Sequence, residues 1–202
     1  PSDIIYGKPT IVENLLGLNF EISMQSFFQT NPASAEKLYQ KVINYTVENN
    51  DLEGKVVMDL FCGTGTIGQL LASQIKNVKI IGVDIVESAI VNARKNAELN
   101  EIKNLDFYAA DVGKFLKEFP EYQGKIDTII LDPPRAGIIP KALLMVIALG
   151  AKRIVYVSCN PATQARDIHL LDGDYAVEKV QPVDMFPHTH HVENVVLLKR
   201  KK

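Results

Sequence analysis

The chain reads Val56-Val57-Met58-Asp59-Leu60-Phe61-Cys62-Gly63-Thr64-Gly65-Thr66-Ile67-Gly68 where a short apolar run passes into a glycine-rich turn. The run predicts a buried strand, and the apolar spacing after the turn predicts a helix over 67–75. The three glycines have the spacing GxGxxG, and Asp84 ends the next expected strand about 20 residues later. This combination is typical of a cofactor site at the carboxyl ends of parallel strands.

Short apolar runs alternate with helical stretches through the rest of the chain. The expected strands are 56–61, 79–83, 105–109, 128–131, 154–158, 176–182 and 192–199, and the expected helices are 67–75, 87–100, 140–149 and 162–171. Continuous apolar strands separated by helices predict a doubly wound, mainly parallel, seven-stranded α/β sheet. No helix separates the last two strands, so they should form an antiparallel pair at one edge.

The N-terminal residues have a different pattern. Two short runs, 10–16 and 20–24, flank a turn at Gly17 and predict a β-hairpin. Asn31-Pro32 then predicts the start of a long helix that continues to Asn49. We therefore expect a β-hairpin extension over 1–31 and a single α/β domain over 32–202.

Composition excludes several classes of protein. The 202 residues are 47% hydrophobic and carry 22 Lys and Arg against 24 Asp and Glu, a net charge of −2. These values are typical of a globular protein and not of a disordered or strongly basic one. Two cysteines cannot build a disulfide framework, and no apolar run reaches the roughly 20 residues of a membrane span. We expect a cytoplasmic monomer without a membrane or metal partner, and we interpret the start at Pro1 as that of a piece of a longer protein.

Acidic residues around the glycine turn favour one cofactor over another. The turn fits either a dinucleotide or S-adenosylmethionine. A carboxylate at Asp59 suits a cationic ligand and would repel a diphosphate, which favours S-adenosylmethionine. Asp111 follows the third strand, where its side chain could bind the adenine amino group, cap a helix, or do both. We interpret Cys62 as a packed residue and not as a nucleophile.

A second motif, Asp132-Pro133-Pro134-Arg135, follows the expected strand 128–131. The prolines stiffen the loop, so that Asp132 should point into the crevice at the sheet edge and could bind a base there. In enzymes that methylate the exocyclic amine of a base, an aromatic residue generally follows the prolines. Arg135 takes that place and weakens this alternative.

Five stretches across nearly the whole chain resemble the catalytic domain of the RNA uracil-5-methyltransferase family, whose members act on tRNA or rRNA. They are Phe27-Phe28-Gln29-Thr30-Asn31, 59–66, 132–137, 158–167 and 186–193, and they occur in the family's order. The resemblance implies a Rossmann-like class I methyltransferase fold with S-adenosylmethionine as methyl donor and RNA as partner. It also implies an RNA-binding domain upstream of this chain.

The resemblance implies a role for individual residues. Cys159 corresponds to the nucleophile and Glu193 to the base. The cofactor and target-base pocket would include Gln29, Phe61, Gly63, Thr66, Asp84, Asp111 and Asp132; Thr66 stands where the family often has Asn. Phe27 would stack on the target base, and Gln29, Asp132 and Arg135 would also contact the substrate. His188 and His191 would orient the base or pack their loop.

The chemistry explains the pairing of a thiol with a carboxylate. A thiolate that adds to carbon 6 of uracil makes carbon 5 nucleophilic, and a base must later remove the carbon 5 proton. We expect helix N–H donors near Pro161-Ala162 to activate Cys159. A surface patch of Lys103, Arg135, Lys152 and Arg153 is our candidate for phosphate contacts. The alternatives are a base amino-methyltransferase, a non-catalytic cofactor- and RNA-binding module, and a dehydrogenase.

Overall fold

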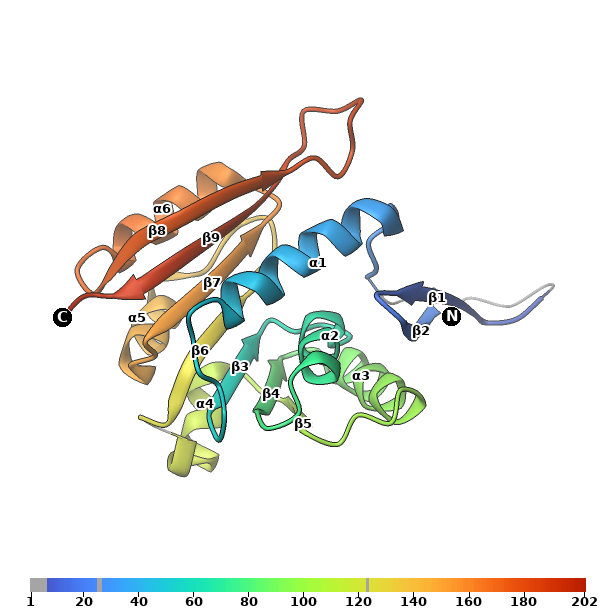
Figure 1. Ribbon diagram of the computed structural model, residues 1–202, viewed down its shortest axis with the longest axis horizontal. Helices are drawn as coiled ribbons and strands as arrows, with labels where there is room; N and C mark the ends of the chain where they lie inside the picture. The colour runs from blue at the N-terminus through green and yellow to red at the C-terminus, as the bar shows by residue number, and fades with distance from the viewer. Residues whose placement is uncertain (1–6, 25–26, 123) are drawn as a thin grey trace.

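A seven-stranded sheet organises the chain, which the computed structural model describes over residues 7–24, 27–122 and 124–202 (Figure 1). The strands are β3 (Val56–Leu60), β4 (Lys79–Asp84), β5 (Leu105–Ala109), β6 (Ile126–Leu131), β7 (Arg153–Ser158), β8 (Tyr175–Val183) and β9 (Glu193–Arg200). Their spatial order is β5-β4-β3-β6-β7-β9-β8. β9 runs antiparallel to both of its neighbours, β7 and β8, and the other pairs of this sheet are parallel, so the predicted parallel sheet with an antiparallel final pair is confirmed.

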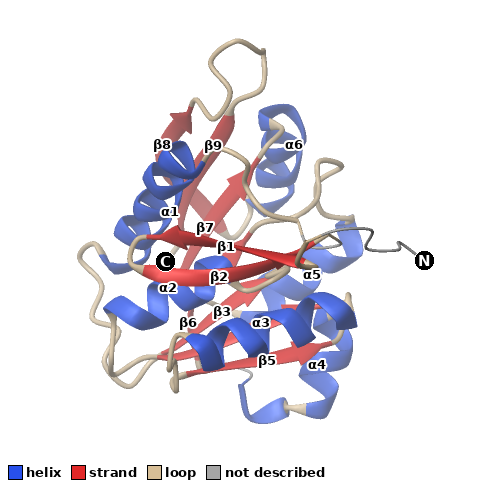
Figure 2. Ribbon diagram, turned by 90° about the vertical axis from the view of Figure 1, so that its right-hand side faces the viewer, coloured by secondary structure: helices blue, strands red, loops and turns tan. Residues whose placement is uncertain are grey.

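Helices cover both faces of this sheet (Figure 2). One face carries α1 (Pro32–Val47), α2 (Thr66–Gln74) and α3 (Glu87–Leu99), and the other carries α4 (Val112–Glu118), α5 (Pro140–Leu149) and α6 (Pro161–Leu171). Successive strand residues point to opposite faces, so Val57 belongs to the first core and Met58 to the second. Burial on both faces explains why the strands are continuous apolar runs. Within the described residues, no helix has the length and hydropathy needed to cross a membrane.

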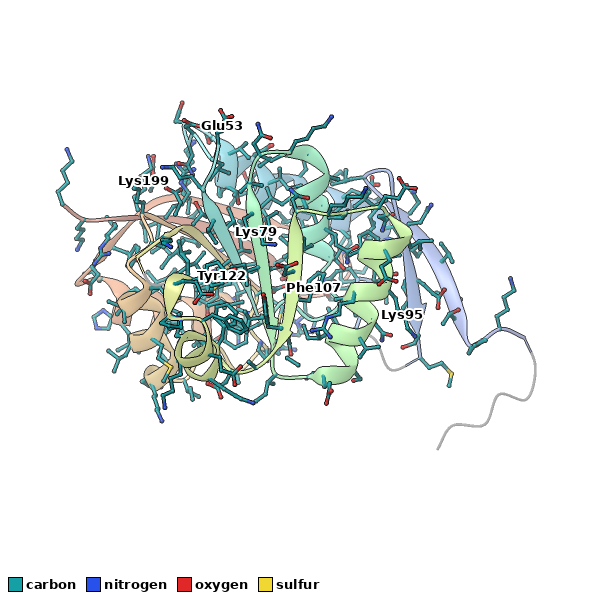
Figure 3. The ribbon with its side chains drawn as sticks, turned by 90° about the horizontal axis from the view of Figure 1, so that it is seen from below. Glu53, Lys79, Lys95, Phe107, Tyr122 and Lys199 are labelled. Atoms are coloured by element: carbon teal, nitrogen blue, oxygen red, sulfur yellow. The ribbon has the colours of Figure 1, made fainter. Side chains whose placement is uncertain are left out.

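One helix, α4, is absent from the sequence-based assignment, which has no helix between 109 and 128. The carboxylate of Asp111 accepts a hydrogen bond from Lys114 N at 2.9 Å and caps α4. Phe115 then stacks on Phe119 with 5.0 Å between ring centroids, and a short 3₁₀ helix, η1 (Pro120–Tyr122), follows. Figure 3 looks onto the β5 edge, with Phe107 towards α3 and Tyr122 on the α4 side.

The predicted hairpin is confirmed as β1 (Thr10–Leu15) and β2 (Leu18–Ser23), although residues 1–6, 25 and 26 of the expected extension lie outside the described residues. Asn96 of α3 holds the backbone of β2 with both ends of its amide, because Glu21 N donates to Oδ1 at 2.8 Å and Nδ2 donates to Glu21 O at 3.2 Å. Leu15 and Phe20 are fully buried in the core that α1, α2 and α3 share with the sheet. The hairpin is therefore packed onto the α/β fold.

The chain changes direction across the sheet between β3 and β6. From β3 the order runs outward through β4 to β5, and the chain then returns to β6 and runs the other way to β7. Such a switch point opens a crevice at the carboxyl ends of the adjacent strands.

Candidate active site

A cavity of about 620 Å³ lies at the carboxyl ends of the parallel strands. The walls come from the glycine turn after β3, the end of β4, the loops after β6 and β7, the start of β9, and α1. β9 runs antiparallel, so its first residue, Glu193, lies at the same edge as the last residues of β7. Ser158 pairs with Asn194, which brings Cys159 and Glu193 to the same wall from positions 34 residues apart in the sequence.

The glycine turn forms because its backbone takes left-handed conformations. Gly63 has φ of 53° and Gly65 has φ of 73°, a region that L side chains rarely adopt. A Cβ on Gly65 would also lie 2.3 Å from Cζ of Phe107. Asp84 fixes the turn, since its Oδ2 accepts a hydrogen bond from Gly63 N at 2.9 Å and its Oδ1 accepts one from Val86 N at 2.8 Å.

Asp59 has no solvent exposure, and its two carboxylate oxygens differ. Oδ2 accepts a hydrogen bond from Gly68 N at 3.0 Å, whereas Oδ1 has no partner among the described residues. Burial, together with the charge of Asp84, raises the pKa of Asp59 to about 7, against the lowering effect of Gly68 N–H. A buried oxygen without a donor at a cavity wall is costly and calls for a ligand or a proton.

Two more acids, Asp132 and Glu193, line the same cavity. Burial and then the charges of Glu193 and Asp59 raise the pKa of Asp132 to about 8. Burial also raises the pKa of Glu193, whose side chain belongs to a residue only 8% exposed. Like charges in a site of low dielectric oppose each other's ionisation, so these carboxylates share a tendency to hold protons.

Cys159 lies between β7 and α6, where Asn160 caps α6 by accepting a hydrogen bond from Ala162 N at 3.2 Å. In the free site, the surroundings of the thiol act mainly against the expected activation. Burial and then the carboxylates of Glu193 and Asp132 raise the pKa of Cys159, and Arg135 and a backbone N–H only partly oppose them. The free site therefore favours the thiol over the thiolate.

A hydrogen-bonded network joins α6 to the loop after β6. Thr163 Oγ1 donates to Arg135 O at 3.1 Å, and Asp167 Oδ2 accepts from Ile138 N at 2.7 Å and from Tyr156 Oη at 2.6 Å. Gly137 sits against this network, because a Cβ there would lie 2.6 Å from Asp167 Oδ2. The network fixes the loop that carries Asp132 relative to the segment that carries Cys159.

Most of the site residues expected from the sequence meet in this one cavity. Its lining includes Phe27, Gln29, Phe61, Gly63, Thr66, Asp84, Asp132, Arg135, Cys159 and Glu193. Phe27 is 79% exposed, so an apolar ring stands open at the wall. Asp111 is not part of the lining and caps α4 instead, so its expected contact with a cofactor stays a prediction.

The proposed phosphate patch does not form as one surface. Arg153 is 4% exposed and donates to the carbonyl oxygens of Tyr45 at 2.6 Å and Glu48 at 3.0 Å, at the end of α1. Lys152 pairs with Asp127 at the start of the strands, whereas Arg135 lies at their carboxyl ends and contacts His191 Nδ1 at 3.3 Å. Arg135 alone of the four lines the cavity.

The sequence analysis missed Tyr39, a residue of α1 that lines the cavity at 6% exposure. Burial and then the charges of Asp132, Glu193 and Asp59 raise its pKa, so the phenol stays neutral. The apolar spacing of α1 marks this helix face as buried but does not distinguish a core position from a cavity wall. The start of α3 also contributes, through Ser88, Ala89 and Asn92.

Comparison with known proteins gives consistent matches along the chain. Residues 11–201 match the family described as tRNA (Uracil-5-)-methyltransferase. A Clostridium tetani protein named uncharacterized RNA methyltransferase is 50% identical over 200 residues, which cover 98% of this chain and 42% of that protein. A Bacteroides thetaiotaomicron protein of the same name is 50% identical over 197 residues, covering 96% of this chain and 42% of that protein.

A solved structure matches at similar coverage. The Pyrococcus abyssi tRNA (uracil-54, C5)-methyltransferase in complex with S-adenosyl-L-homocysteine superposes with a TM-score of 0.81 at 38% identity. The match covers 96% of this chain and 45% of that one. The chain thus spans less than half the length of these relatives.

Proposed function

The chain belongs to the tRNA (uracil-5-)-methyltransferase family, and on this premise we propose that it transfers a methyl group from S-adenosylmethionine to carbon 5 of a uridine in RNA. The observation that carries the proposal is the meeting of one thiol, Cys159, with one buried carboxylate, Glu193, in the cavity beside the glycine turn. The reaction needs a thiol that adds to carbon 6 of the uracil and a carboxylate that removes the proton from carbon 5 of the same ring.

The residues around the glycine turn fit a cationic methyl donor. Asp59 and Asp132 line the cavity, Oδ1 of Asp59 has no hydrogen-bond donor among the described residues, and Asp84 ends β4 where a ribose-binding acid is expected. S-adenosylmethionine would supply an electrophilic methyl group on a sulfonium. Asp59, Phe61, Gly63 and Asp84 would hold it, because a diphosphate in the same place would meet unpaired negative charge.

Cys159 would act first. Its thiolate adds to carbon 6 of the uracil and forms an S–C bond, and the ring electrons move to carbon 5 and the carbon 4 carbonyl. Carbon 5 then takes the methyl group, whose bond to the sulfonium sulfur breaks and leaves a neutral thioether. Since neighbouring carboxylates raise the pKa of the free thiol, we expect the positive donor to favour the thiolate by offsetting their charge.

Glu193 would act second. Carbon 5 then bears both a methyl group and a proton, and the carboxylate removes the proton so that the C–S bond breaks and the thiolate leaves. Burial raises the pKa of Glu193, which makes its ionised form a stronger base. Phe27, exposed at the cavity wall, offers a ring on which an unstacked base can lie.

A covalent trap tests the nucleophile. RNA isolated from cells grown with 5-fluorouracil contains bases whose carbon 5 fluorine cannot be removed as a proton, so the adduct should persist through denaturing electrophoresis. The wild-type chain and Cys62→Ala should form the adduct in the presence of S-adenosylmethionine, and Cys159→Ala should not. Methylation of ordinary RNA without any adduct would contradict the covalent route and favour the amino-methyltransferase alternative.

Substitution of the base tests its role. Glu193→Gln keeps the shape but cannot accept the proton, so ordinary RNA should accumulate as a covalent complex that already carries the methyl group. Rapid release of methylated RNA by this variant would argue against Glu193 as the base. Binding of S-adenosylhomocysteine without turnover, in the wild type, would instead favour the non-catalytic module.

Mapping of 5-methyluridine in cellular RNA identifies the target. We propose a uridine in tRNA or rRNA, and cells with and without the gene should differ in 5-methyluridine at that position. The difference should disappear when Cys159→Ala replaces the wild type.

A further inference from the structure

The charged side chains around the cavity are almost all acidic. Four of the described residues that line it are acidic: Asp59, Asp84, Asp132 and Glu193. Among the same lining residues, Arg135 is the one cation. Asp59 and Glu193 are buried, and Oδ1 of Asp59 has no hydrogen-bond donor among these residues. We call Asp59, Asp132 and Glu193 the acidic wall.

Two members of the acidic wall lie between the two halves of the proposed site. Strand order places Asp59 of β3 and Asp132, which follows β6, between Asp84 at the end of β4 and Cys159 after β7, and Glu193 begins β9 on the far side of β7. A methyl group that passes from a donor at the glycine turn to a base at Cys159 would pass Asp59 and Asp132. The sulfonium that bears this methyl group would then lie close to these two acids.

We propose that the acidic wall reads the charge of the donor: binding of S-adenosylmethionine displaces protons from Asp59 and Asp132, whereas the product, which lacks the sulfonium charge, displaces fewer and is released. This inference rests on the proposed function. It assigns a purpose to the acids besides Glu193, namely discrimination between donor and product by one unit of charge.

Other titratable and charged groups near the acidic wall do not account for the proton release. They are Tyr39 from α1, Cys62 after β3, Asp84 at the end of β4, Arg135 after β6 and Cys159 after β7. Tyr39 and the two thiols have raised pKa values and stay neutral near pH 7. Arg135 is exposed and is shared with His191, so it does not neutralise Asp59.

The free site should hold protons at neutral pH. The pKa of Asp59 is raised to about 7 and that of Asp132 to about 8, chiefly by burial, so both are partly or mostly protonated at pH 7. A positive charge beside them lowers both values and releases protons. Linkage then requires that the affinity for the donor rise with pH in this range.

Calorimetry measures the exchange directly. The wild-type chain is titrated at pH 7.0 with S-adenosylmethionine, S-adenosylhomocysteine or sinefungin, whose amine replaces the sulfonium with another cation. The heat is compared in buffers of different ionisation enthalpy, which gives the number of protons released. We expect about one proton for each of the two cationic ligands and less than half of that for S-adenosylhomocysteine.

The affinity ratio gives a second readout. Between pH 5.5 and 6.5, at least one unit below the ordinary pKa of an α-amino group, the preference for S-adenosylmethionine over S-adenosylhomocysteine should rise by up to about tenfold per pH unit. Asp59→Asn keeps an acceptor for Gly68 N–H but cannot ionise, so it should flatten this slope. Asp106→Asn, a surface acid paired with Lys79, is the matched control and should leave the slope unchanged.

The outcomes separate this inference from the proposed function. Equal proton release by the donor and the product in the wild type, or an Asp59→Asn slope equal to that of the wild type, would overturn the inference while the methyl-transfer proposal stands. Failure of all three ligands to bind would overturn both. Because the first comparison uses the wild type alone, a variant that does not fold leaves the test intact.

Discussion

Replacement of Asp167 by Ala should destabilise the fold, because it removes the hydrogen bonds that join α6 and β7 to the loop after β6. Asp167 has no solvent exposure, and its carboxylate accepts hydrogen bonds from Tyr156 Oη at 2.6 Å, Ile138 N at 2.7 Å and Arg166 Nη2 at 2.7 Å. Alanine removes the acceptor and leaves the Tyr156 hydroxyl and the Ile138 amide buried without partners. The side chain of Arg166 is 54% exposed and can turn to water.

The magnitude follows from the two orphaned donors. Each buried donor without a partner costs about 1–3 kcal/mol, so we expect a loss of roughly 2–6 kcal/mol in the free energy of unfolding for the two donors. With a urea slope of about 2–3 kcal/mol/M for a chain of this size, the unfolding midpoint should fall by about 1–3 M. Tyr156→Phe, which removes one donor and leaves the carboxylate its other partners, should cost only about 1 kcal/mol.

Urea unfolding followed by circular dichroism measures these changes. Asp172→Ala is the matched control, since Asp172 follows the same helix, is 71% exposed and pairs with Lys201 at the surface. Its cost should stay below about 1 kcal/mol. If Asp167→Ala unfolds at the same urea concentration as Asp172→Ala, the network does not hold the loop and our reasoning from its hydrogen bonds is wrong.

Three further predictions concern the turn, the acidic wall and the end of α1. Gly65→Ala combines a left-handed φ of 73° with a Cβ 2.3 Å from Phe107 Cζ, so it should cost about 2–4 kcal/mol in urea unfolding, against about 1–2 kcal/mol for Gly63→Ala, whose Cβ would meet open space. The pKa of Asp132 is about 8 in the fold against an ordinary 3.8, so the folded chain keeps a proton that the unfolded chain loses, and stability falls as pH rises from about 4 to 8. Asp132→Asn cannot ionise, so its free energy of unfolding relative to that of the wild type should rise by about 1–3 kcal/mol from pH 5 to pH 8. An unchanged difference between the two pH values would argue against the raised pKa. Arg153→Met should lower the thermal midpoint, because the carbonyl groups that Arg153 binds lose their donor at a cost of about 2–4 kcal/mol. The affinity for RNA should stay unchanged, whereas weaker RNA binding would support a role of Arg153 in phosphate contacts.

The sequence alone determined the order and type of most elements. The glycine turn after Asp59, the alternation of apolar strands with helices, and the missing helix before β9 predicted the sheet and its antiparallel end, because strand and helix periodicities are local properties of the chain. Helix α4 was missed although Asp111 caps it and its apolar residues have helical spacing. Its stability comes from aromatic stacking of Phe115 and Phe119 with neighbouring rings, which a short segment does not reveal.

The tertiary structure decided which of the predicted residues act together and in what charge state. Cys159 and Glu193 meet because β9 runs antiparallel beside β7, and Tyr39 joins them because α1 covers the face of the sheet beside these two strands. Arg153 is a basic residue in the sequence but binds the end of a helix in the fold. Burial and the proximity of like charges set the pKa values of the acidic wall and of the thiol, and both depend on groups that are distant in the sequence. A sequence carries the identity of each titratable group, whereas its protonation depends on the solvent and charges that only folding brings around it.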